Sequence, residues 1–164
     1  MLRILFVCLG NICRSPMAEG LFRKHVADMQ LSDHIFCDSG GTASYHLGEL
    51  ADKRMRQTAD SHGITLTHKA RQFKRNDFED FHYVLVMDQQ NYNDVMRLKP
   101  INATAEVIFL RSFDDMVQDE KEVPDPYYGN PEDFETVYYI LEGCTRNFLQ
   151  HLVKKHSLPA AQHS

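Results

Sequence analysis

The sequence lacks the features that would place it in a membrane or mark it for export. No apolar run among its 164 residues approaches the roughly 20 residues that a helix needs to cross a bilayer. The short apolar stretch after Met1 ends at Cys8 and not at a small-residue cleavage site, so we expect no signal peptide. We therefore expect a cytoplasmic protein that has no membrane partner.

Positively charged residues are fewer than negatively charged ones in this chain. The chain has 18 lysines and arginines against 23 aspartates and glutamates, and its formal net charge is -5. Nucleic-acid-binding proteins are usually basic, so this balance argues against a nucleic-acid partner. An anionic substrate would have to be attracted by a local group of residues, because the field of the whole chain would repel it.

Cysteine is scarce, and the spacing of the cysteines is uninformative for metal binding. The four cysteines are Cys8, Cys13, Cys37 and Cys144. A chain of this length without an export signal is not expected to depend on disulfides. No C-x-x-C pair and no paired-histidine spacing accompanies them, so we expect no zinc. The glycine-rich and lysine-containing signatures of nucleotide-binding domains are missing as well.

Short apolar runs alternate along the chain with stretches of helical periodicity. Runs of strand length occupy residues 3–7, 35–38, 83–87 and 107–110. Helices are expected over residues 16–29, 52–62 and 89–98, followed by a long last helix. The buried stripe of that last helix consists of Phe134, Val137, Tyr138, Leu141, Thr145, Phe148, Leu149 and Leu152. Residues 39–43 and 114–131 are expected to form loops.

This alternation favours an α/β fold of three layers, in which a parallel sheet is covered by helices on both faces. We find no repeat and no linker, and expect a single domain over residues 1–158 with a frayed tail at 159–164. In such folds, ligands bind beyond the carboxyl ends of the strands. The segment directly after the first strand is therefore where we expect the chemistry.

That segment has the composition of a phosphate-binding loop. It reads Cys8-Leu9-Gly10-Asn11-Ile12-Cys13-Arg14-Ser15, and Pro16 suits the first turn of the following helix. A tight loop that enters a helix directs several N–H groups at an anion, which the helix dipole also favours. Gly10 and Asn11 tolerate left-handed backbone angles, and the planar fork of Arg14 can hold two phosphate oxygens.

The same loop is suited to activating a nucleophile. A thiolate at a helix N-terminus beside an arginine is stabilised relative to the thiol, and the thiolate is the reactive form. Ser15 can donate a hydrogen bond to the sulfur of Cys8. The alternative is that Cys8 is only a small buried residue and that the loop binds an anion without reacting. The position of the Cys8–Ser15 segment between a strand and a helix favours the catalytic interpretation.

A general acid is needed for the leaving group, and Asp125 is the candidate. It begins the segment Asp125-Pro126-Tyr127-Tyr128, which lies in a predicted loop from which a carboxyl group can reach a pocket. Tyr127 and Tyr128 can line a slot for a flat ring. Taken alone, the segment is more typical of an ordinary turn with packed tyrosines.

These two segments together resemble the low molecular weight protein tyrosine phosphatase family. The resemblance extends from Ile4 to about Leu152, and its most specific parts are residues 7–16 and 125–129, with support from 38–39, 68–72 and 87–88. It implies a flavodoxin-like, four-stranded parallel sheet of the phosphotyrosine protein phosphatase I type. It also implies a metal-independent protein-tyrosine phosphatase that forms a phosphocysteine intermediate.

The resemblance also implies roles for individual residues. Cys8 matches the nucleophile, Arg14 the phosphate clamp, and Asp125 the general acid that later acts as a base. Ser15 matches the hydroxyl that stabilises the thiolate. The remaining matches are Asn11 for the strained loop, Ser39 and His68 for its support, Tyr127 and Tyr128 for the pocket wall, and Cys13 for a second cysteine that can pair with the nucleophile under oxidation.

Apolar side chains at the expected pocket rim bear on the substrate. Leu9 and Ile12 lie in the loop beside Gly10 and Cys13, and we expect Tyr45 to join them at the rim. This lining suits a phenyl ring, whereas related phosphoarginine phosphatases have a threonine where Ile12 stands. We expect phosphotyrosine-containing proteins as partners, with a tyrosine kinase among the candidates, and phosphate or other oxyanions as product or inhibitor. We also expect a monomer that dimerises weakly at most.

Two further functions compete with this interpretation. A thiol-coupled arsenate reductase shares the spacing of Cys8 and Arg14 but needs more cysteines in a mobile segment, whereas Cys37 lies in a predicted strand and Cys144 in the last helix. A phosphate-binding module would keep Arg14 without needing both Cys8 and Asp125. Their joint presence favours the phosphatase.

Overall fold

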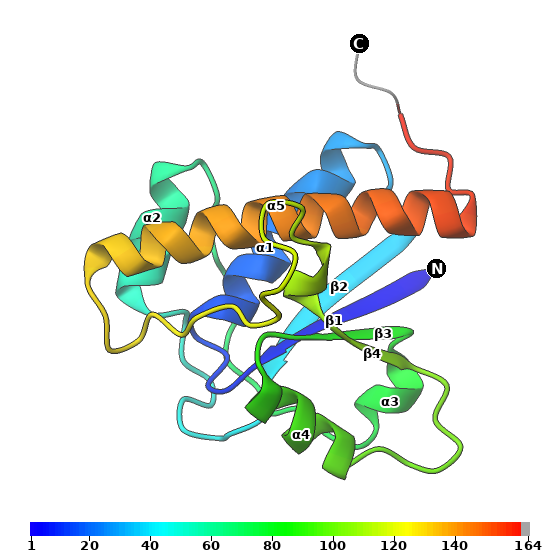
Figure 1. Ribbon diagram of the computed structural model, residues 1–164, viewed down its shortest axis with the longest axis horizontal. Helices are drawn as coiled ribbons and strands as arrows, with labels where there is room; N and C mark the ends of the chain where they lie inside the picture. The colour runs from blue at the N-terminus through cyan, green and yellow to red at the C-terminus, as the bar shows by residue number, and fades with distance from the viewer. Residues whose placement is uncertain (162–164) are drawn as a thin grey trace.

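The centre of the molecule is a parallel sheet. The computed structural model describes residues 1–161. The strands β1 (Leu2–Cys8), β2 (Ile35–Gly41), β3 (Tyr83–Val86) and β4 (Glu106–Phe109) are arranged in the order β2-β1-β3-β4, and every neighbouring pair is parallel. The prediction of a four-stranded parallel sheet is confirmed (Figure 1).

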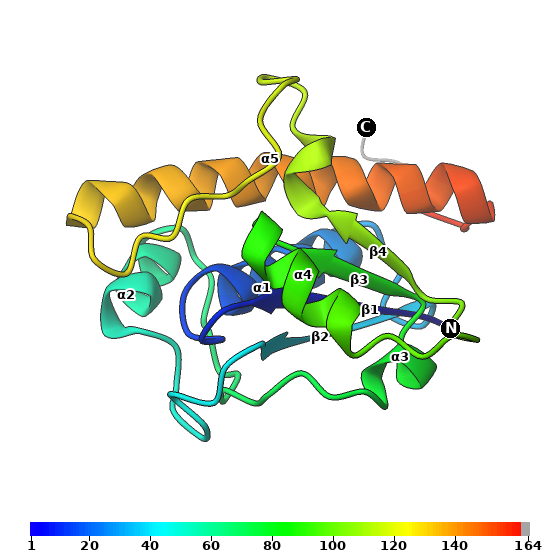
Figure 2. The ribbon, with the colours of Figure 1, turned by 60° about the horizontal axis from the view of Figure 1, so that its bottom comes forward.

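Helices cover both faces of this sheet. They are α1 (Arg14–Asp28), α2 (Lys53–Ser61), α3 (Asp77–Asp80), α4 (Gln89–Arg97), α5 (Pro131–His156) and the 3-10 turn η1 (Leu110–Phe113). Figures 1 and 2 show α1 and α5 on one face and α3 and α4 on the other, while α2 lies against the beginning of α5. The predicted three layers are therefore present. None of the described helices is both long enough and apolar enough to cross a bilayer.

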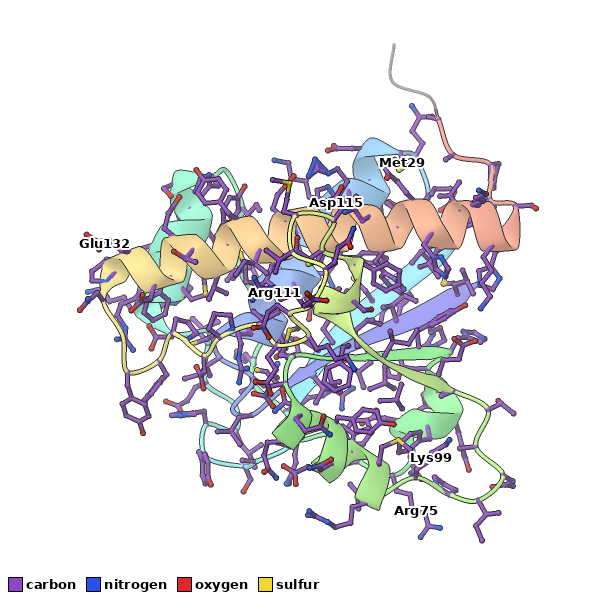
Figure 3. The ribbon with its side chains drawn as sticks, in the orientation of Figure 1. Met29, Arg75, Lys99, Arg111, Asp115 and Glu132 are labelled. Atoms are coloured by element: carbon purple, nitrogen blue, oxygen red, sulfur yellow. The ribbon has the colours of Figure 1, made fainter. Side chains whose placement is uncertain are left out.

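The alternation of side chains along β1 explains why the sheet needs both layers. Ile4 and Phe6 belong to the core shared with α1 and α5, whereas Leu5 and Val7 belong to a second core shared with α3 and α4. All four are fully buried, because successive side chains of a strand point to opposite faces. In the larger core, Phe148 of α5 packs 5.6 Å from Phe22 of α1 between ring centres. Figure 3 shows side chains filling the space between α5 and the sheet.

Three local expectations differ from the structure. Residues 39–41 belong to strand β2 and are not a loop, because Ser39, Gly40 and Gly41 pair in register with Phe6, Val7 and Cys8. Small residues there allow the chain after β1 to approach closely, since a Cβ on Gly41 would lie 2.7 Å from the carbonyl oxygen of Leu9. The short elements α3 and η1 were not predicted, because four residues are too few to display a period.

The chain continues beyond α5 without regular structure. The amide of Ala161 donates a hydrogen bond to the carbonyl oxygen of Met29, and Leu158 and Ala160 pack against the larger core. The rest of the predicted tail, residues 162–164, lies outside the described residues.

Candidate active site

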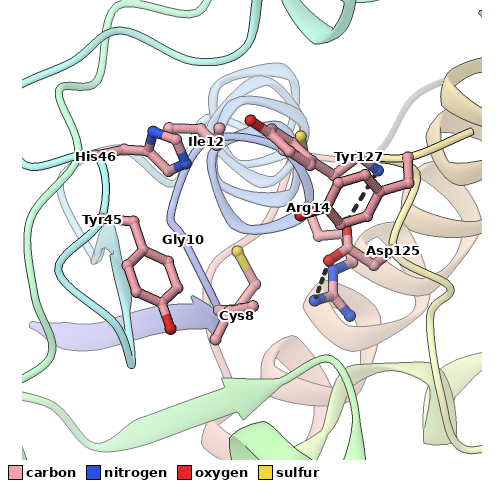
Figure 4. A pocket seen from close by; sticks show the side chains of 11 residues that line it. Cys8, Gly10, Ile12, Arg14, Tyr45, His46, Asp125 and Tyr127 are labelled. Carbon is pink, nitrogen blue, oxygen red and sulfur yellow. Dashed lines mark hydrogen bonds and ion pairs between the residues drawn. The ribbon is translucent and has the colours of Figure 1, made fainter.

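The pocket lies at the carboxyl edge of β1, where the chain order of the sheet reverses. From β1 the chain crosses to β2 on one side and then returns to β3 on the other side of β1. Ligands of open α/β sheets bind at such a switch point. A pocket of about 260 Å³ lies there (Figure 4). Its lining residues are Cys8, Leu9, Gly10, Ile12, Cys13, Arg14, Tyr45, His46, Asp125, Tyr127 and Tyr128.

Asn11 fixes the shape of the loop between β1 and α1. Its φ of 58° is in the left-handed region, which few residues other than glycine and asparagine tolerate. The side-chain amide donates to the hydroxyls of Ser15 (2.8 Å) and Ser39 (3.0 Å). Its oxygen accepts from His68 Nε2 (2.8 Å) and from the backbone amide of Arg71 (3.0 Å). The hydrogen-bonding groups of this buried side chain are thus all used to hold the loop.

The hydroxyl of Ser15 lies 3.0 Å from the sulfur of Cys8, and both groups are buried. Ser15 already accepts a hydrogen bond from Asn11, so its own hydrogen is free to be donated. Cys8 Sγ is the nearer acceptor, because the other candidate, the carbonyl oxygen of Gly40, lies 3.4 Å away. A hydrogen bond of this kind stabilises the charged form of the group that accepts it.

Arg14 is 2% exposed and has donors left for a ligand. Its Nη1 donates to Asp88 Oδ2 (2.7 Å) and to the carbonyl oxygen of Val123 (3.0 Å). Its Nη2 lies 3.5 Å from Asp125 Oδ2, and its buried Nε has no hydrogen-bond partner among the described residues. Burial disfavours the guanidinium charge, but Cys8, Asp88 and Asp125 outweigh it and raise the pKa of Arg14. One edge of a charged fork is therefore available to an anion.

Asp125 lies above this fork on the segment that leads to α5 (Figure 4). Its Oδ1 accepts a hydrogen bond from the amide of Tyr127 at 3.1 Å. The segment is tied to the body of the protein by Arg54, whose Nη2 donates to the carbonyl oxygen of Tyr127 (2.9 Å) and to Asp52 Oδ2 (2.8 Å). The side chain of Asp125 is 39% exposed, so it faces the pocket and also reaches water.

The predicted wall residues surround the opening to different depths. Ile12 is buried, Tyr127 and Leu9 are partly exposed, and Tyr45 and Tyr128 are 74% and 96% exposed. Tyr45 and Tyr128 therefore form the outer rim of the pocket, where most of each side chain is free to contact a ligand.

His46 lines the pocket but was not among the predicted residues. Its ring centre lies 6.0 Å from that of Tyr127, and its Nδ1 is 2.8 Å from Glu49 Oε2. A Cβ on Gly10 would lie 3.2 Å from the His46 ring, so the glycine allows this close approach. Nothing in the sequence around His46 distinguished it from the other scattered histidines.

Behind the loop lies a buried polar cluster that sequence reasoning found only in part. Ser39 Oγ donates to Glu19 Oε1 (2.8 Å), and His68 Nδ1 lies 3.2 Å from Glu19 and 3.3 Å from Asp38 Oδ1. Burial raises the pKa of Glu19. Ser39 and His68 were predicted as supports of Asn11, whereas Glu19 carries no sequence signal. Among the described residues, the cluster is hydrogen-bonded to the pocket loop through Asn11, so we propose a supporting role for it.

The remaining cysteines have the character of buried thiols. All four cysteines are free. Burial, with a smaller contribution from Asp52, raises the pKa of Cys13, which disfavours the thiolate form of this pocket residue. Burial also raises the pKa of Cys37 and of Cys144 to about 12. Neither Cys37 nor Cys144 lines the pocket, which counts against an electron relay of the arsenate reductase kind. Pairing of Cys8 with Cys13 stays a prediction.

Comparisons with known proteins agree on one family. Residues 3–158 match the family described as low molecular weight phosphotyrosine protein phosphatase. A protein of that description from Pongo abelii is 45% identical over 149 residues, which are 90% of this chain and 93% of the relative. A crystal structure of a protein tyrosine phosphatase from Entamoeba histolytica, with Hepes in its active site, has a TM-score of 0.89 and 37% identity, and covers 96% of this chain and 100% of its own. The crystal structure of a drosophila arginine phosphatase has a TM-score of 0.86 and 30% identity, and the match covers 92% of this chain and 97% of that protein's chain.

Proposed function

Because the chain belongs to the low molecular weight phosphotyrosine protein phosphatase family and is a protein-tyrosine phosphatase, we propose that Cys8, Arg14 and Asp125 carry out the hydrolysis. The observation that supports this assignment is that the buried guanidinium group of Arg14 lies in the same pocket as Cys8, whose sulfur is 3.0 Å from the Ser15 hydroxyl. The Nε of Arg14 has no hydrogen-bond partner among the described residues. An unpartnered buried donor is costly unless a ligand uses it, and a phosphoryl group would do so.

The first step transfers the phosphoryl group to sulfur. The phosphorus is attacked by the thiolate of Cys8 while its bond to the tyrosine oxygen breaks. The carboxyl group of Asp125 gives its proton to that oxygen, so that tyrosine leaves as the neutral phenol. Arg14 and the N–H groups of the loop hold the phosphoryl oxygens in the transition state, where the charge is spread over them.

The second step releases phosphate. The carboxylate of Asp125 takes a proton from water, and this water attacks the phosphocysteine. The bond between phosphorus and sulfur breaks, and the thiolate of Cys8 leaves with the hydrogen bond from Ser15 to stabilise it. The product is inorganic phosphate, which the same loop can retain as an inhibitor.

The pocket lining favours a phenyl group over a guanidinium group. Ile12 and the ring of Tyr127 offer apolar contacts to a flat ring. The carboxyl group of Asp125 is the only carboxyl group that lines the described pocket, and a bound phosphoarginine would also need partners for its remaining N–H groups. We propose phosphotyrosine as the substrate, and comparison with phosphoarginine peptides tests this choice.

The remaining assignments are part of the same proposal. We propose residues 1–158 as the phosphatase domain, phosphotyrosine-containing proteins as partners with a tyrosine kinase as one candidate, and a cytoplasmic location. We expect neither nucleic acid nor membrane as a partner, no cofactor, and a monomer that dimerises weakly at most.

The experiment is hydrolysis of para-nitrophenyl phosphate by the wild type and by Cys8→Ser in the presence of a chelator. Matched peptides carrying phosphotyrosine or phosphoserine follow. We expect wild-type turnover on the aryl phosphate and the phosphotyrosine peptide alone. Cys8→Ser should lose at least about 10³-fold in kcat while still binding phosphate. Turnover retained in Cys8→Ser would contradict the assignment of the nucleophile.

A further inference from the structure

A second hollow adjoins the active-site pocket. It has a volume of about 440 Å³ and shares Ile12, His46 and Tyr127 with the lining of the pocket. The rest of its lining is Glu49, Leu50, Ala51, Asp52, Lys53 and Arg56. Since the two cavities share these wall residues, a single layer of side chains separates the hollow from the place where the phosphoryl group would bind.

The two carboxylates of this hollow have polar partners, whereas its two cations form no ion pair among the described residues. Asp52 accepts two hydrogen bonds from the side chain of Arg54, and Glu49 is hydrogen-bonded to His46. Lys53 is exposed and forms no ion pair with any described residue. Arg56 donates its Nε to the carbonyl oxygen of Ala51 (2.9 Å), and within the described part of the chain no carboxylate lies at ion-pair distance from it.

The unpaired charges beside the pocket are therefore positive. Arg54, which lies outside the lining, pairs with Asp52. The remaining charged side chains of the hollow are the two cations Lys53 and Arg56 and the one carboxylate of Glu49, which leaves an excess of positive charge. This is the reverse of the chain as a whole, whose net charge is -5. A local positive field beside a binding site selects for negative charge in the ligand.

We propose that this hollow receives an acidic side chain of the substrate, one or two residues away from the phosphotyrosine. The proposal rests on the proposed function and deepens it, because it names the class of phosphotyrosine sequence that the same site prefers. An extended peptide advances roughly 3.3 Å per residue. The side chain of a neighbouring residue can therefore reach the hollow on the other side of Ile12 and Tyr127 while the phosphotyrosine ring stays in the pocket. Lys53 and Arg56 are the residues that determine this specificity.

The hollow also suits the shape of a glutamate. Leu50 and Ala51 give it an apolar side on which the methylene groups of the substrate side chain can lie. The carboxylate can then reach the Lys53 ammonium group or the free edge of the Arg56 guanidinium group, for which a planar carboxylate is the natural partner. A neutral glutamine of the same shape would keep the packing and lose the charge.

The test compares phosphotyrosine peptides that carry Glu or Gln at each of the two positions before and after the phosphotyrosine. We expect kcat/KM to be about fivefold higher for Glu at one or more positions, because single exposed ion pairs contribute little and two cations act together here. The double variant Lys53→Gln/Arg56→Gln should remove this preference. The charge-reversed Lys53→Glu/Arg56→Glu should prefer a lysine-containing peptide.

Two controls separate a failure of this proposal from a failure of the proposed function. Turnover of para-nitrophenyl phosphate, which has no neighbouring residues, should stay at the wild-type level in all of these variants. Lys99→Gln removes an exposed cation on the far side of the molecule from α2 (Figure 3) and should leave the peptide preference unchanged. If the wild type hydrolyses neither the small substrate nor any peptide, the proposed function itself is wrong.

The preference should also weaken as ionic strength rises, because exposed charge pairs are screened by salt. The proposal is overturned if Glu and Gln peptides are hydrolysed equally at every position. It is also overturned if the wild type prefers Glu and both Lys53→Gln and the double variant keep that preference in full. Lys53→Gln alters only an exposed side chain, so its result does not depend on whether the Arg56 variant folds well.

Discussion

Asn11 joins the backbone shape of the loop after β1 to the hydrogen bonding of Cys8, the proposed nucleophile. Its left-handed backbone turns the loop, while its amide donates to Ser15, whose hydrogen is then directed to Cys8. The same side chain is held from behind by His68 and Arg71. One buried residue therefore sets both the geometry of the anion site and the hydrogen bond to sulfur.

Replacing Asn11 separates these two effects. Asn11→Ala should lose about 2–4 kcal/mol of unfolding free energy, because buried partners lose their hydrogen bonds and alanine lacks the polar side chain that lets asparagine tolerate the left-handed backbone. Asn11→Gly should recover about 1 kcal/mol of this loss by relieving the strain. Urea denaturation measures both. In each variant kcat should fall, and a fully active Asn11→Gly would show that the link through Ser15 is unimportant.

Because we propose that Asp125 protonates the leaving group, its removal should matter most where that group is poor. Asp125→Asn should lower kcat for phenyl phosphate by about 10²–10⁴-fold, whereas para-nitrophenyl phosphate, which needs little proton assistance, should lose about tenfold at most. Asp119→Asn, which removes an exposed carboxylate from the same connecting segment, is the matched control and should behave as the wild type. Equal losses on the two substrates would argue against a general acid.

At the level of elements, the end of β2 and the phosphate loop fit against each other through backbone contacts. The amides of Thr42 and Ala43 donate to the carbonyl oxygens of Cys8 and Leu9 at 2.9 Å each. Gly41 directly precedes Thr42, and a Cβ there would approach both the Leu9 carbonyl oxygen (2.7 Å) and the Asn11 backbone nitrogen (3.1 Å). Since backbone atoms cannot swing away as a flexible side chain does, the loop itself would have to move.

Gly41→Ala should therefore damage catalysis more than a glycine change elsewhere. We expect kcat/KM for para-nitrophenyl phosphate to fall about 10²-fold, the loss typical of an ångström-scale displacement of reacting groups. Gly143→Ala on α5 is the matched control, because the nearest atom to its new Cβ would be Arg146 Nη2 at 3.8 Å. It should retain activity and gain about 0.5–1 kcal/mol of stability, since alanine favours helix. An active Gly41→Ala would show that the loop tolerates the shift.

At the level of the whole molecule, buried and paired carboxylates make stability depend on pH. The hydrogen bonds from Arg54 lower the pKa of Asp52. The pKa of Asp38 is also lowered, because hydrogen bonds from His68 and Ser39 and the charge of Arg71 together outweigh the opposing effect of burial. Glu19 acts in the opposite direction, because burial raises its pKa and the folded state then holds a proton more tightly.

The contribution of Asp52 should be complete above the pKa of an unfolded aspartate, about 3.9, and should be lost as the pH falls through the lower pKa of the folded state. Asp52→Asn should thus reduce the unfolding free energy at neutral pH and flatten its fall below pH about 4. Urea titrations of both proteins between neutral and acidic pH measure this. Parallel curves for the two proteins would mean that Asp52 contributes no pH-dependent stability.

The local pattern of apolar and polar residues was sufficient to predict the features that depend on residues close together in the chain. Each helix or strand is encoded in a short stretch of sequence, so most of them could be predicted in their order along the chain. The same holds for the tight loop after β1, which groups Cys8, Arg14 and Ser15 within eight residues. The fold class followed from the alternation of apolar strands with helices. The loop segment alone made Asp125 a candidate acid, and the resemblance to a known family was needed to connect it with Cys8.

The tertiary structure decided which distant residues meet. Asp88, Val123 and Asp125 surround the Arg14 fork from segments more than 70 positions away, and Glu19 supports Ser39 from another element. The continuation of β2 to Gly41, the place of His46 in the pocket and the unpaired cations of Lys53 and Arg56 likewise depend on packing between elements. A sequence period records how a segment folds onto its neighbours in the chain, whereas these contacts arise only once separate elements have been brought to the same edge of the sheet.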